Sequence, residues 1–313
     1  MTRPPILIMS ALIQNFVGLS SKDYDLTILS DQPDRDGFLA EHGPKFEAVV
    51  AGGMERIDSA RMDLMPNLRL IAVIATGMSG LDLEAARQRG IAVTNAGSSN
   101  AGDVADFAVM LMLAARRNLI GGDTHVRGGQ WPKARLPASR SIASQRVGIV
   151  GLGHIGLGVA QRLAPFGCDV RWWGPNPKPD VPWLRMERLA ELAEWATTLI
   201  IAVSGKADTS GLIDAPILNA LGPDGLIINV ARGFVIDEPA MIAALREGRL
   251  GGAGLDVFAH EPDNGAQWAD LPNVLLAPHS AGATIESLEQ VMFDARDNLR
   301  RLFAGETLIN RVV

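Results

Sequence analysis

The stretch Val147-Gly-Ile-Val-Gly-Leu-Gly-His-Ile-Gly156 decides the fold of this chain. Its first four residues predict a buried β-strand, and residues 155–164 predict a helix. Gly151 permits a tight turn, Gly153 allows a pyrophosphate close to the backbone, and Gly156 lets helix and strand pack closely. This strand–turn–helix context favours a dinucleotide-binding unit over glycines that serve packing alone.

The start of the predicted helix is suited to phosphate groups. The N-terminus of a helix presents unpaired N–H groups and the positive end of the helix dipole. We therefore expect the cofactor pyrophosphate to lie against the glycine loop and the first helical turn, which comprise Gly151, Gly153, His154, Ile155 and Gly156.

The residues at the end of the next strand, Val170–Trp173, should determine which cofactor binds. An acidic residue there would bind the ribose hydroxyls of NAD, whereas a basic residue would accept the 2′-phosphate of NADP. The chain has Gly174-Pro-Asn-Pro-Lys178 and no carboxylate before Asp180. Asn176 and Lys178 can donate to a phosphate, so NADP(H) is favoured. The alternative is that Lys178 is only a solvated loop charge and that both NADP(H) and NAD(H) bind.

Length and composition exclude several classes of protein. A chain of 313 residues favours two domains, and 47% apolar residues supply a sizeable core. The net charge of −6 without a basic cluster argues against a nucleic-acid partner. No apolar run is long enough for a membrane span, and we read the apolar start, 6–13, as a first strand rather than a signal peptide. A single cysteine, Cys168, fits a reducing cytoplasm, and no metal site is indicated.

The order of elements indicates an α/β protein with two βα series. Short apolar runs before residue 95 alternate with polar or helical stretches, which predicts a small parallel sheet covered by helices. A long apolar helix is expected at 103–118, followed by an aperiodic stretch at 121–145, a second βα series from Val147 to about 280, and an amphipathic helix at 285–303. The five early runs are 6–9, 26–29, 47–51, 70–75 and 91–94.

Three chemically complementary side chains follow predicted buried strands of the second series. Arg232 follows Leu226–Val230, Glu261 follows Ala253–Phe258, and His279 follows Val274–Ala277. Ligands bind beyond the carboxyl ends of strands in an open parallel sheet. A guanidinium, a carboxylate and an imidazole gathered there predict an active site for hydride transfer.

The chemistry of these groups suits a 2-oxo acid. Arg232 can bind the substrate carboxylate and carbonyl through its planar fork. Protonated His279 can donate to the carbonyl oxygen, and Glu261 can orient the imidazole and favour its charged form. Taken singly, each has a plain alternative: a strand-end ion pair, a surface charge before Pro262, or a histidine satisfied within a turn.

Several motifs together resemble those of the D-isomer-specific 2-hydroxyacid dehydrogenase family over nearly the full chain, with the nearest likeness to glyoxylate/hydroxypyruvate reductases. The resemblance implies two Rossmann-like or flavodoxin-like domains with an active-site cleft between them. Residues 1–97 plus 283–313 would bind substrate, and residues 98–282 would bind the dinucleotide. The motifs are Gly151–Gly156, Ile228–Glu238, Gly252–Phe258, Glu261-Pro262 and Pro278–Gly282.

The resemblance also implies secondary site residues. Backbone N–H groups of the loop Thr76–Gly80 would hold the substrate carboxylate, Asp256 would bind the nicotinamide carboxamide, and Trp131 would gate the substrate, from a neighbouring subunit in some relatives. A plain glycine turn is the alternative for the loop. The remaining residues expected at substrate are Gly53, Met78, Ser79 and Gly80, and those lining the cofactor are Val203, Ser204 and Ala231.

We therefore expect a cytoplasmic, dimeric NAD(P)H-dependent reductase of small 2-oxo acids, with glyoxylate and hydroxypyruvate leading. The apolar helix at 103–118 favours a dimer interface, with burial inside the monomer as the alternative. The rival readings are a phosphoglycerate-type dehydrogenase and a cofactor-sensing binding protein similar to related transcriptional corepressors. The formate dehydrogenases of the family lack the acid partner of the histidine, whereas Glu261 is present here.

Overall fold

The computed structural model describes residues 3–313, and the chain folds into two compact units. Unit 1 comprises residues 1–100 and 284–313, and unit 2 comprises residues 101–283. The boundaries expected after residues 97 and 282 lie close to these divisions. Within the described residues, no helix combines the length and apolar character needed to cross a membrane.

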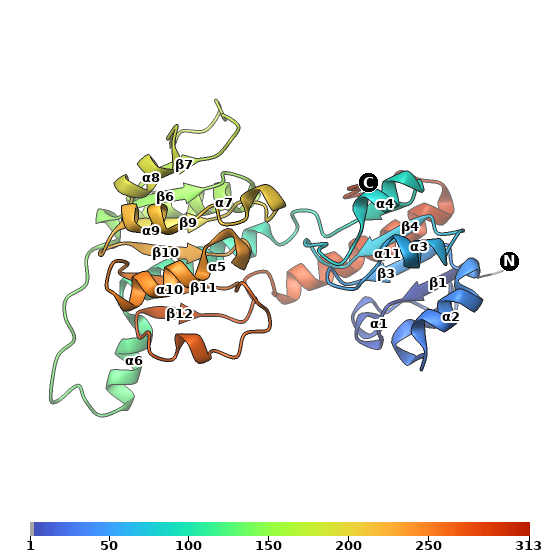
Figure 1. Ribbon diagram of the computed structural model, residues 1–313, viewed down its shortest axis with the longest axis horizontal. Helices are drawn as coiled ribbons and strands as arrows, with labels where there is room; N and C mark the ends of the chain where they lie inside the picture. The colour runs from blue at the N-terminus through green and yellow to red at the C-terminus, as the bar shows by residue number, and fades with distance from the viewer. Residues whose placement is uncertain (1–2) are drawn as a thin grey trace. The chain divides into compact units, whose positions relative to one another are not determined.

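Unit 1 is built on a five-stranded parallel sheet in the order β2-β1-β3-β4-β5 (Figure 1). This order is that of the flavodoxin-like doubly wound fold. All five strands expected from the early apolar runs are confirmed, with ends that differ by at most two residues. They are β1 (Pro5–Ile8), β2 (Asp25–Ile28), β3 (Ala48–Ala51), β4 (Leu70–Val73) and β5 (Ala92–Thr94).

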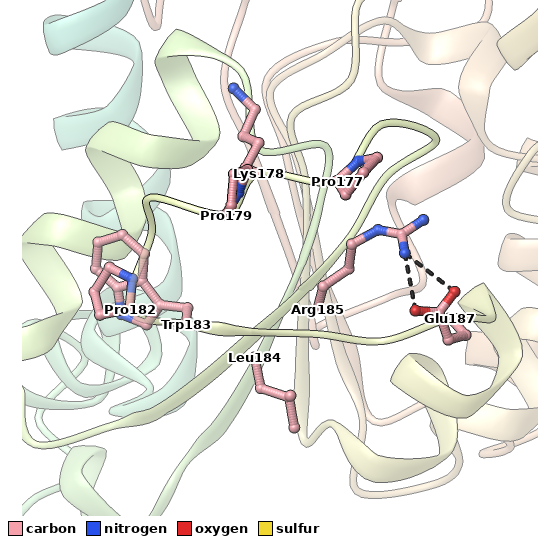
Figure 2. Close-up of a pocket in the computed structure, with 8 residues that line it drawn as sticks. All are labelled: Pro177, Lys178, Pro179, Pro182, Trp183, Leu184, Arg185 and Glu187. Carbon is pink, nitrogen blue, oxygen red and sulfur yellow. Dashed lines mark hydrogen bonds and ion pairs between the residues drawn. The ribbon is translucent and has the colours of Figure 1, made fainter.

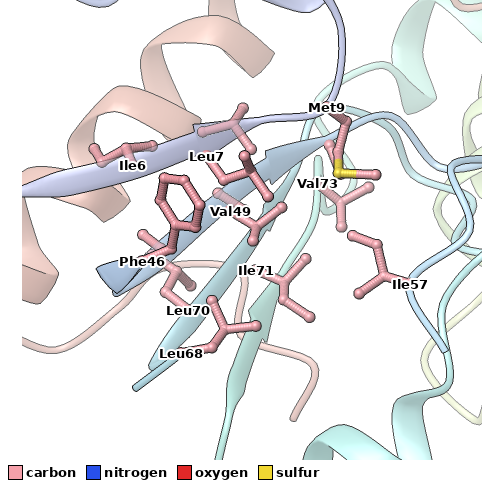
Figure 3. Close-up of a cluster of buried hydrophobic side chains, with 14 of the residues drawn as sticks. Ile6, Leu7, Met9, Phe46, Val49, Ile57, Leu68, Leu70, Ile71 and Val73 are labelled. Carbon is pink, nitrogen blue, oxygen red and sulfur yellow. The ribbon is translucent and has the colours of Figure 1, made fainter. Parts of the chain in front are cut away.

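Helices cover the sheet of unit 1, and its central strands are buried throughout. Residues of β3 and β4 are all buried, as expected of a parallel sheet covered on both faces. Figure 3 shows Phe46, Val49 and Ile71 among the side chains of this core. The helices are α1 (Ala11–Val17), α2 (Arg35–His42), α3 (Ser59–Asp63), α4 (Leu83–Gln88) and α11 (Ile285–Ala304).

The last helix returns the chain to unit 1. The amphipathic pattern at 285–303 predicted α11, and Met292 and Leu299 on its buried side join the core of this unit. Thr284 caps its N-terminus, and Gly305 ends it with φ 70°, a conformation that costs glycine little. The tail beyond it pairs with β5 through Thr94 and Arg311.

Unit 2 contains a seven-stranded parallel sheet in the order β12-β11-β10-β9-β6-β7-β8. Order reverses between β6 and β9, as in the Rossmann fold, so the predicted dinucleotide-binding architecture is confirmed. The strands are β6 (Arg146–Val150), β7 (Asp169–Trp173), β8 (Leu184–Arg185), β9 (Thr198–Ile201), β10 (Leu226–Asn229), β11 (Gly252–Leu255) and β12 (Val274–Leu276).

Helices pack on both faces of this sheet (Figure 1). Ile149 faces the core beneath α5 and α7, and the next residue, Val150, faces the core beneath α8, α9 and α10, as strand geometry requires. Ala105 on α5 meets Gly158 on α7, where a methyl group would be only 3.0 Å away. The helices are α5 (Ala101–Arg116), α7 (His154–Leu163), α8 (Leu189–Trp195), α9 (Ala215–Leu221) and α10 (Glu238–Arg246).

Three details differ from the expectations. The run 274–277 was expected to be buried, but β12 is an edge strand and Leu276 is 43% exposed. The two-residue strand β8 was too short to leave a pattern. The stretch at 121–145 begins inside a helix, α6 (Leu119–Arg127), whose Gly121-Gly122 pair hides it from propensity arguments.

The apolar helix expected at 103–118 is α5, and most of its apolar side chains are covered by its own unit. Val104, Ala108 and Met112 are among its buried residues, while Met110 is 50% exposed. Burial inside the unit therefore accounts for much of the apolar character that favoured a dimer interface. The oligomeric state stays a prediction.

Candidate active site

The glycine loop and the loop after β9 meet where the strand order reverses. Gly151 has φ 92°, and a side chain there would lie within 3.0 Å of three atoms of Val203. A side chain at Gly156 would lie 2.0 Å from the Gly151 carbonyl oxygen. The predicted roles of these two glycines in a tight turn and in close packing therefore have direct steric reasons. Val203, the exposed Ser204 and the buried Ala231 all follow strands at this edge of the sheet.

The start of α7 fits a dinucleotide. Gly153 is the N-cap of the helix, and no atom lies within 4 Å of the position of an added Cβ, so the approach to its backbone is open. His154 is exposed in the first turn and Ile155 is half-buried. The first N–H groups of a helix have no partner within it. The loop thus supplies an open cradle of donors and a positive dipole end for a pyrophosphate.

The predicted adenosine end of the site carries a residue that the sequence did not reveal. Arg185, on β8, donates from Nε and Nη2 to the carbonyl oxygen of Gly174, at 3.2 and 3.0 Å. Its Nη1 also pairs with Glu187 at 3.0 Å, as the dashed lines of Figure 2 show. A guanidinium therefore lies beside Gly174, the position at which an NAD-type site would carry a carboxylate. Only the pairing of β8 with β7, invisible in the sequence, brings it there.

A shallow recess surrounds this arginine. Lys178 shares it with Arg185, while Asn176 is exposed on the same loop. In Figure 2, the Lys178 side chain extends away from Glu187, and three prolines and Trp183 shape the apolar wall. The lining residues are Pro177, Lys178, Pro179, Pro182, Trp183, Leu184, Arg185 and Glu187.

Backbone hydrogen bonds connect the ends of the three strands that carry the predicted catalytic residues. The N–H of Asp256 donates to the Asn229 carbonyl oxygen at 3.0 Å, and the N–H of His279 donates to the Asp256 carbonyl oxygen at 2.8 Å. The hydrogen bonds across β10, β11 and β12 thus continue past the ends of β11 and β12. Arg232, Glu261 and His279 follow it on the carboxyl side of the sheet.

His279 and Glu261 are in direct contact. Nδ1 of His279 lies 2.6 Å from Oε2 of Glu261, and the other carboxylate oxygen accepts a hydrogen bond from the Phe258 N–H at 2.9 Å. Glu261 is mostly buried, whereas nearly half of the His279 side chain is exposed. The carboxylate is therefore fixed from behind, and the outer nitrogen of the imidazole remains for another partner.

Asp256 holds the turn that carries His279. The carboxylate is 2% exposed, and its oxygens accept from the N–H groups of Ser280 at 2.7 Å and Ala281 at 3.0 Å. His279 has φ 53°, an uncommon conformation for a residue with a side chain. Burial raises the pKa of the Asp256 carboxyl, while the two N–H donors and His279 oppose that rise. The resemblance predicted a nicotinamide contact for Asp256, and the structure adds this anchoring of the turn.

Asn229 and Gly205 define the surroundings of Arg232. The buried side chain of Asn229 accepts from the Ala231 N–H and donates to the Arg232 carbonyl oxygen, both at 3.0 Å. An added Cβ at Gly205 would lie 2.3 Å from Cγ of Arg232, so the stem of the arginine occupies that space. Both are positioning features that the sequence reasoning missed.

In unit 1, two loops that follow neighbouring strands touch through glycines. A side chain at Gly53 would lie 2.0 Å from the Gly77 carbonyl oxygen. The N–H of Gly80 donates to the Gly53 carbonyl oxygen at 3.0 Å, so this predicted substrate residue already uses its donor. No backbone hydrogen bond from Met78 or Ser79 to another described residue is present. The contact of these two N–H groups with a substrate carboxylate stays a prediction.

Trp131 lies on the segment that follows α6. It is 65% exposed, and Leu119, Ile120 and Val126 on α6 are also more than half exposed. Four large apolar side chains, three on α6 and one on the segment 128–141 that follows it (the arm), are thus open to solvent. Within residues 3–313, no group of three or more His, Cys, Asp or Glu side chains is placed to hold a metal ion.

Comparison with known proteins identifies the family. The model of the D-isomer specific 2-hydroxyacid dehydrogenase NAD binding domain matches residues 109–281. The chain belongs to the D-isomer-specific 2-hydroxyacid dehydrogenase family. This confirms the resemblance seen in the motifs, and it assigns the protein to the nicotinamide-dependent oxidoreductases.

Similar members of the family cover nearly the whole chain. The 2-ketogluconate reductase of Gluconobacter oxydans is 40% identical over 88% of this chain and 89% of its own length. The glyoxylate/hydroxypyruvate reductase A of Arabidopsis thaliana is 33% identical over 97% of this chain and 96% of its own.

Two solved 2-hydroxyacid dehydrogenases share the fold. That from Ketogulonicigenium vulgare is 39% identical, with a TM-score of 0.94 over 100% of this chain and 99% of its own. The NADPH-dependent glyoxylate/hydroxypyruvate reductase of Sinorhizobium meliloti, in complex with NADP and malonate, is 31% identical. Its TM-score is 0.90 over 100% of this chain and 97% of its own.

Proposed function

We propose that this dehydrogenase reduces small 2-oxo acids, with glyoxylate and hydroxypyruvate leading, to D-2-hydroxy acids at the expense of NADPH. The 2.6 Å contact between His279 and Glu261, beside Arg232 on one sheet edge, carries the proposal. A corepressor-like binding protein would not need an acid–base pair of this kind. A phosphoglycerate-type enzyme would be expected to hold a carboxylate where this chain has Gly174.

The proposed mechanism assigns one task to each side chain. Arg232 binds the carboxylate and carbonyl of the 2-oxo acid through its fork of donors. The nicotinamide, when bound, supplies the hydride that reduces the 2-oxo carbon. His279 donates the proton from Nε2 to the carbonyl oxygen as charge develops there, while Glu261 keeps the ring oriented and stabilises the imidazolium.

The other predicted residues bind and orient. The glycine loop with His154 and Ile155 would hold the pyrophosphate, with Val203, Ser204 and Ala231 along the cofactor. Asp256 would accept from the carboxamide on lone pairs that its two backbone donors leave free. The N–H groups of Met78 and Ser79, supported by Gly53 and Gly80, would bind the substrate carboxylate. Unit 1 is accordingly proposed as the substrate domain and unit 2 as the dinucleotide domain.

The preference for NADPH rests on the charges around Gly174. No carboxylate stands at the end of β7, and Arg185 reaches Gly174 from β8 while Lys178 and Asn176 lie on the loop between them. A 2′-phosphate would find Lys178 and the Glu187-paired Arg185 here, whereas a ribose diol would find no side-chain carboxylate at Gly174. The Sinorhizobium meliloti relative is NADPH-dependent by name.

A binding experiment tests this preference without turnover. We expect 2′,5′-ADP to bind at least about tenfold more tightly than 5′-AMP, the ratio that one charge-assisted hydrogen bond of roughly 1.5 kcal/mol gives. Arg185→Gln should remove most of the difference. Arg188→Gln, at an exposed arginine paired with Glu191, is the matched control. Equal affinities in the unmodified protein would leave NADH as the cofactor.

The activity itself is tested by the loss of reduced-nicotinamide absorbance. NADPH and NADH should each be paired with glyoxylate, hydroxypyruvate, 2-ketogluconate and hydroxyphenylpyruvate. Turnover of the two smallest acids with NADPH is expected. No turnover with any pair would favour the binding-protein reading. Because the Gluconobacter oxydans relative is named a 2-ketogluconate reductase, 2-ketogluconate is the second candidate substrate.

We also propose a cytoplasmic homodimer. The exposed apolar side chains of α6 and the arm beyond it favour a second copy as their cover. Trp131 on this arm would then approach the partner's substrate site, as the resemblance implies. Sedimentation of the protein and of Trp131→Ala separates assembly from gating: the variant should remain dimeric while its KM changes.

A further inference from the structure

A buried glutamate outside the predicted catalytic group clamps the loop that carries Glu261. Glu238, the first residue of α10, is 7% exposed. Its Oε2 accepts from the N–H of Ala259 at 2.9 Å, and its Oε1 accepts from Nε2 of Gln267 at 3.0 Å. Glu261 lies between these two contact points in the chain. One carboxylate therefore holds the loop on both sides of Glu261.

The clamp extends through Gln267 into the loop. The same Nε2 of Gln267 also donates to Oδ2 of Asp263 at 2.9 Å, two residues after Glu261. Next to Ala259, the N–H of Phe258 donates to Glu261 itself. A continuous set of hydrogen bonds thus connects Glu238 to both flanks of Glu261.

The loop has little freedom to shift on its inner side. A side chain at Gly233 would lie 1.8 Å from the carbonyl carbon of Phe258, so the turn after Arg232 packs directly against the backbone of this loop. The N-terminal position of Glu238 on α10 also explains how a carboxylate is tolerated in the interior, because the helix dipole favours negative charge there.

We infer that Glu238 is a positioning residue for catalysis, acting through Glu261 on His279. This inference rests on the proposed function, in which His279 is the proton donor. Without the clamp, the loop from Phe258 to Gln267 loses both outer anchors, and the Glu261 carboxylate loses the fixed direction that orients the imidazole. Small displacements of a catalytic group are costly, up to about 100-fold in rate.

A double-mutant cycle separates positioning from a general contribution to stability. Glu238→Ala should lower kcat by roughly 10- to 100-fold while KM changes little. In a Glu261→Gln background the same change should cost less than about threefold, because the carboxylate that it positions is already gone. Equal costs in both backgrounds would overturn the inference.

Two further variants guard against a folding defect. Glu238→Gln retains an acceptor for the Ala259 N–H, but its amide faces Nε2 of Gln267, so its kcat should fall between those of the unmodified protein and Glu238→Ala. Gln267→Ala keeps the anchor at Ala259, removes the bonds of Gln267 to Glu238 and Asp263, and should lower kcat severalfold. The control Glu247→Ala, at the exposed far end of α10, should change nothing. Full activity of folded Glu238→Gln and Gln267→Ala would also overturn the inference.

A spectroscopic readout does not depend on turnover. The hydrogen bond between Nδ1 of His279 and Oε2 of Glu261, at 2.6 Å, should give a downfield imidazole N–H resonance, assigned by its loss in His279→Gln. Glu238→Ala should broaden or remove this resonance in the protein without substrate. A resonance unchanged by Glu238→Ala would refute the clamp even if no 2-oxo acid proved to be a substrate. A lost resonance with no turnover would retain the clamp and refute the proposed function alone.

Discussion

Oε2 of Glu261 lies 2.6 Å from Nδ1 of His279, and the opposite oxygen of that carboxylate is held by the Phe258 N–H. This arrangement fixes which ring nitrogen faces outward. With Nδ1 engaged as the donor to a carboxylate, Nε2 is the nitrogen left for a substrate oxygen. The same atom, Nε2 of His279, can then donate the proton in the reductive direction and accept it in the oxidative direction.

Replacing either member of this pair should impair chemistry more than binding. His279→Gln is expected to fold, retain cofactor affinity and lose roughly 10²- to 10⁴-fold in kcat, because a positioned general acid is gone. Glu261→Gln should cost less, roughly 10- to 10³-fold, since the imidazole remains but is less well oriented. Steady-state kinetics with calorimetric cofactor binding checks both. Near-normal turnover of folded His279→Gln would remove His279 from the mechanism.

Activity should depend both on the guanidinium group of Arg232 and on the space that its side chain occupies beside Gly205. Arg232→Ala should raise KM and lower kcat, because the planar fork touches groups present in the ground and transition states; Arg232→Lys should follow in weaker form. Gly205→Ala should produce a milder version of the same change, since the new methyl group would lie 2.3 Å from Cγ of Arg232. Kinetic constants of the variants decide this. Unchanged constants for Gly205→Ala would show that the arginine stem can move without cost.

The architecture was predictable because it depends on local sequence patterns, namely apolar runs and the spacing of glycines. The run Val147–Val150 and the glycines at 151, 153 and 156 specify a strand, a turn and a helix that must be adjacent in space. The catalytic candidates were equally visible, since carboxyl ends of parallel strands gather on one edge. Such signals require only the periodicity of one segment and the chirality of βα connections.

Other features could not be predicted because they depend on partners distant in sequence. Arg185 reaches Gly174 only because a two-residue strand pairs with β7. The role proposed for Glu238 could not be predicted without knowing that α10 packs beside the loop 258–267. The bond from Ala259 to Glu238 joins residues that are 21 positions apart in the chain. The N–H of Gly80 already donates to the Gly53 carbonyl oxygen, and no local sequence pattern indicates this bond.

The contact between the two unit 1 loops should limit substitution at Gly53. Gly53→Ala would place a methyl group 2.0 Å from the backbone oxygen of Gly77, so the loops must separate. We expect a loss of about 1–3 kcal/mol in the free energy of unfolding, together with a raised KM. Urea unfolding and kinetics measure both. Gly102→Ala is the control: its methyl group would meet only Arg162 at 3.7 Å, an ordinary contact, so the free energy of unfolding should not fall. Equal stability of the two variants would contradict the steric argument.

Asp256 should make stability depend on pH in an unusual direction for a carboxyl group. Because burial raises its pKa in the folded protein above the ordinary 3.8, the native state holds this proton more tightly than the unfolded chain. Its contribution is therefore fully present below pH 3.8 and is lost as pH rises through the higher native pKa.

Asp256→Asn removes this titration while keeping the shape of the side chain. Its amide would face one of the two N–H donors of Ser280 and Ala281, at a cost of about 1–3 kcal/mol, and looser control of the His279 turn should lower kcat by roughly tenfold or more. Urea unfolding of both proteins from about pH 4 to pH 7 gives the difference in unfolding free energy. The advantage of the unmodified protein should shrink as pH rises. An advantage that grows with pH would mean that the two backbone donors outweigh burial, and that the carboxylate is the better-held form.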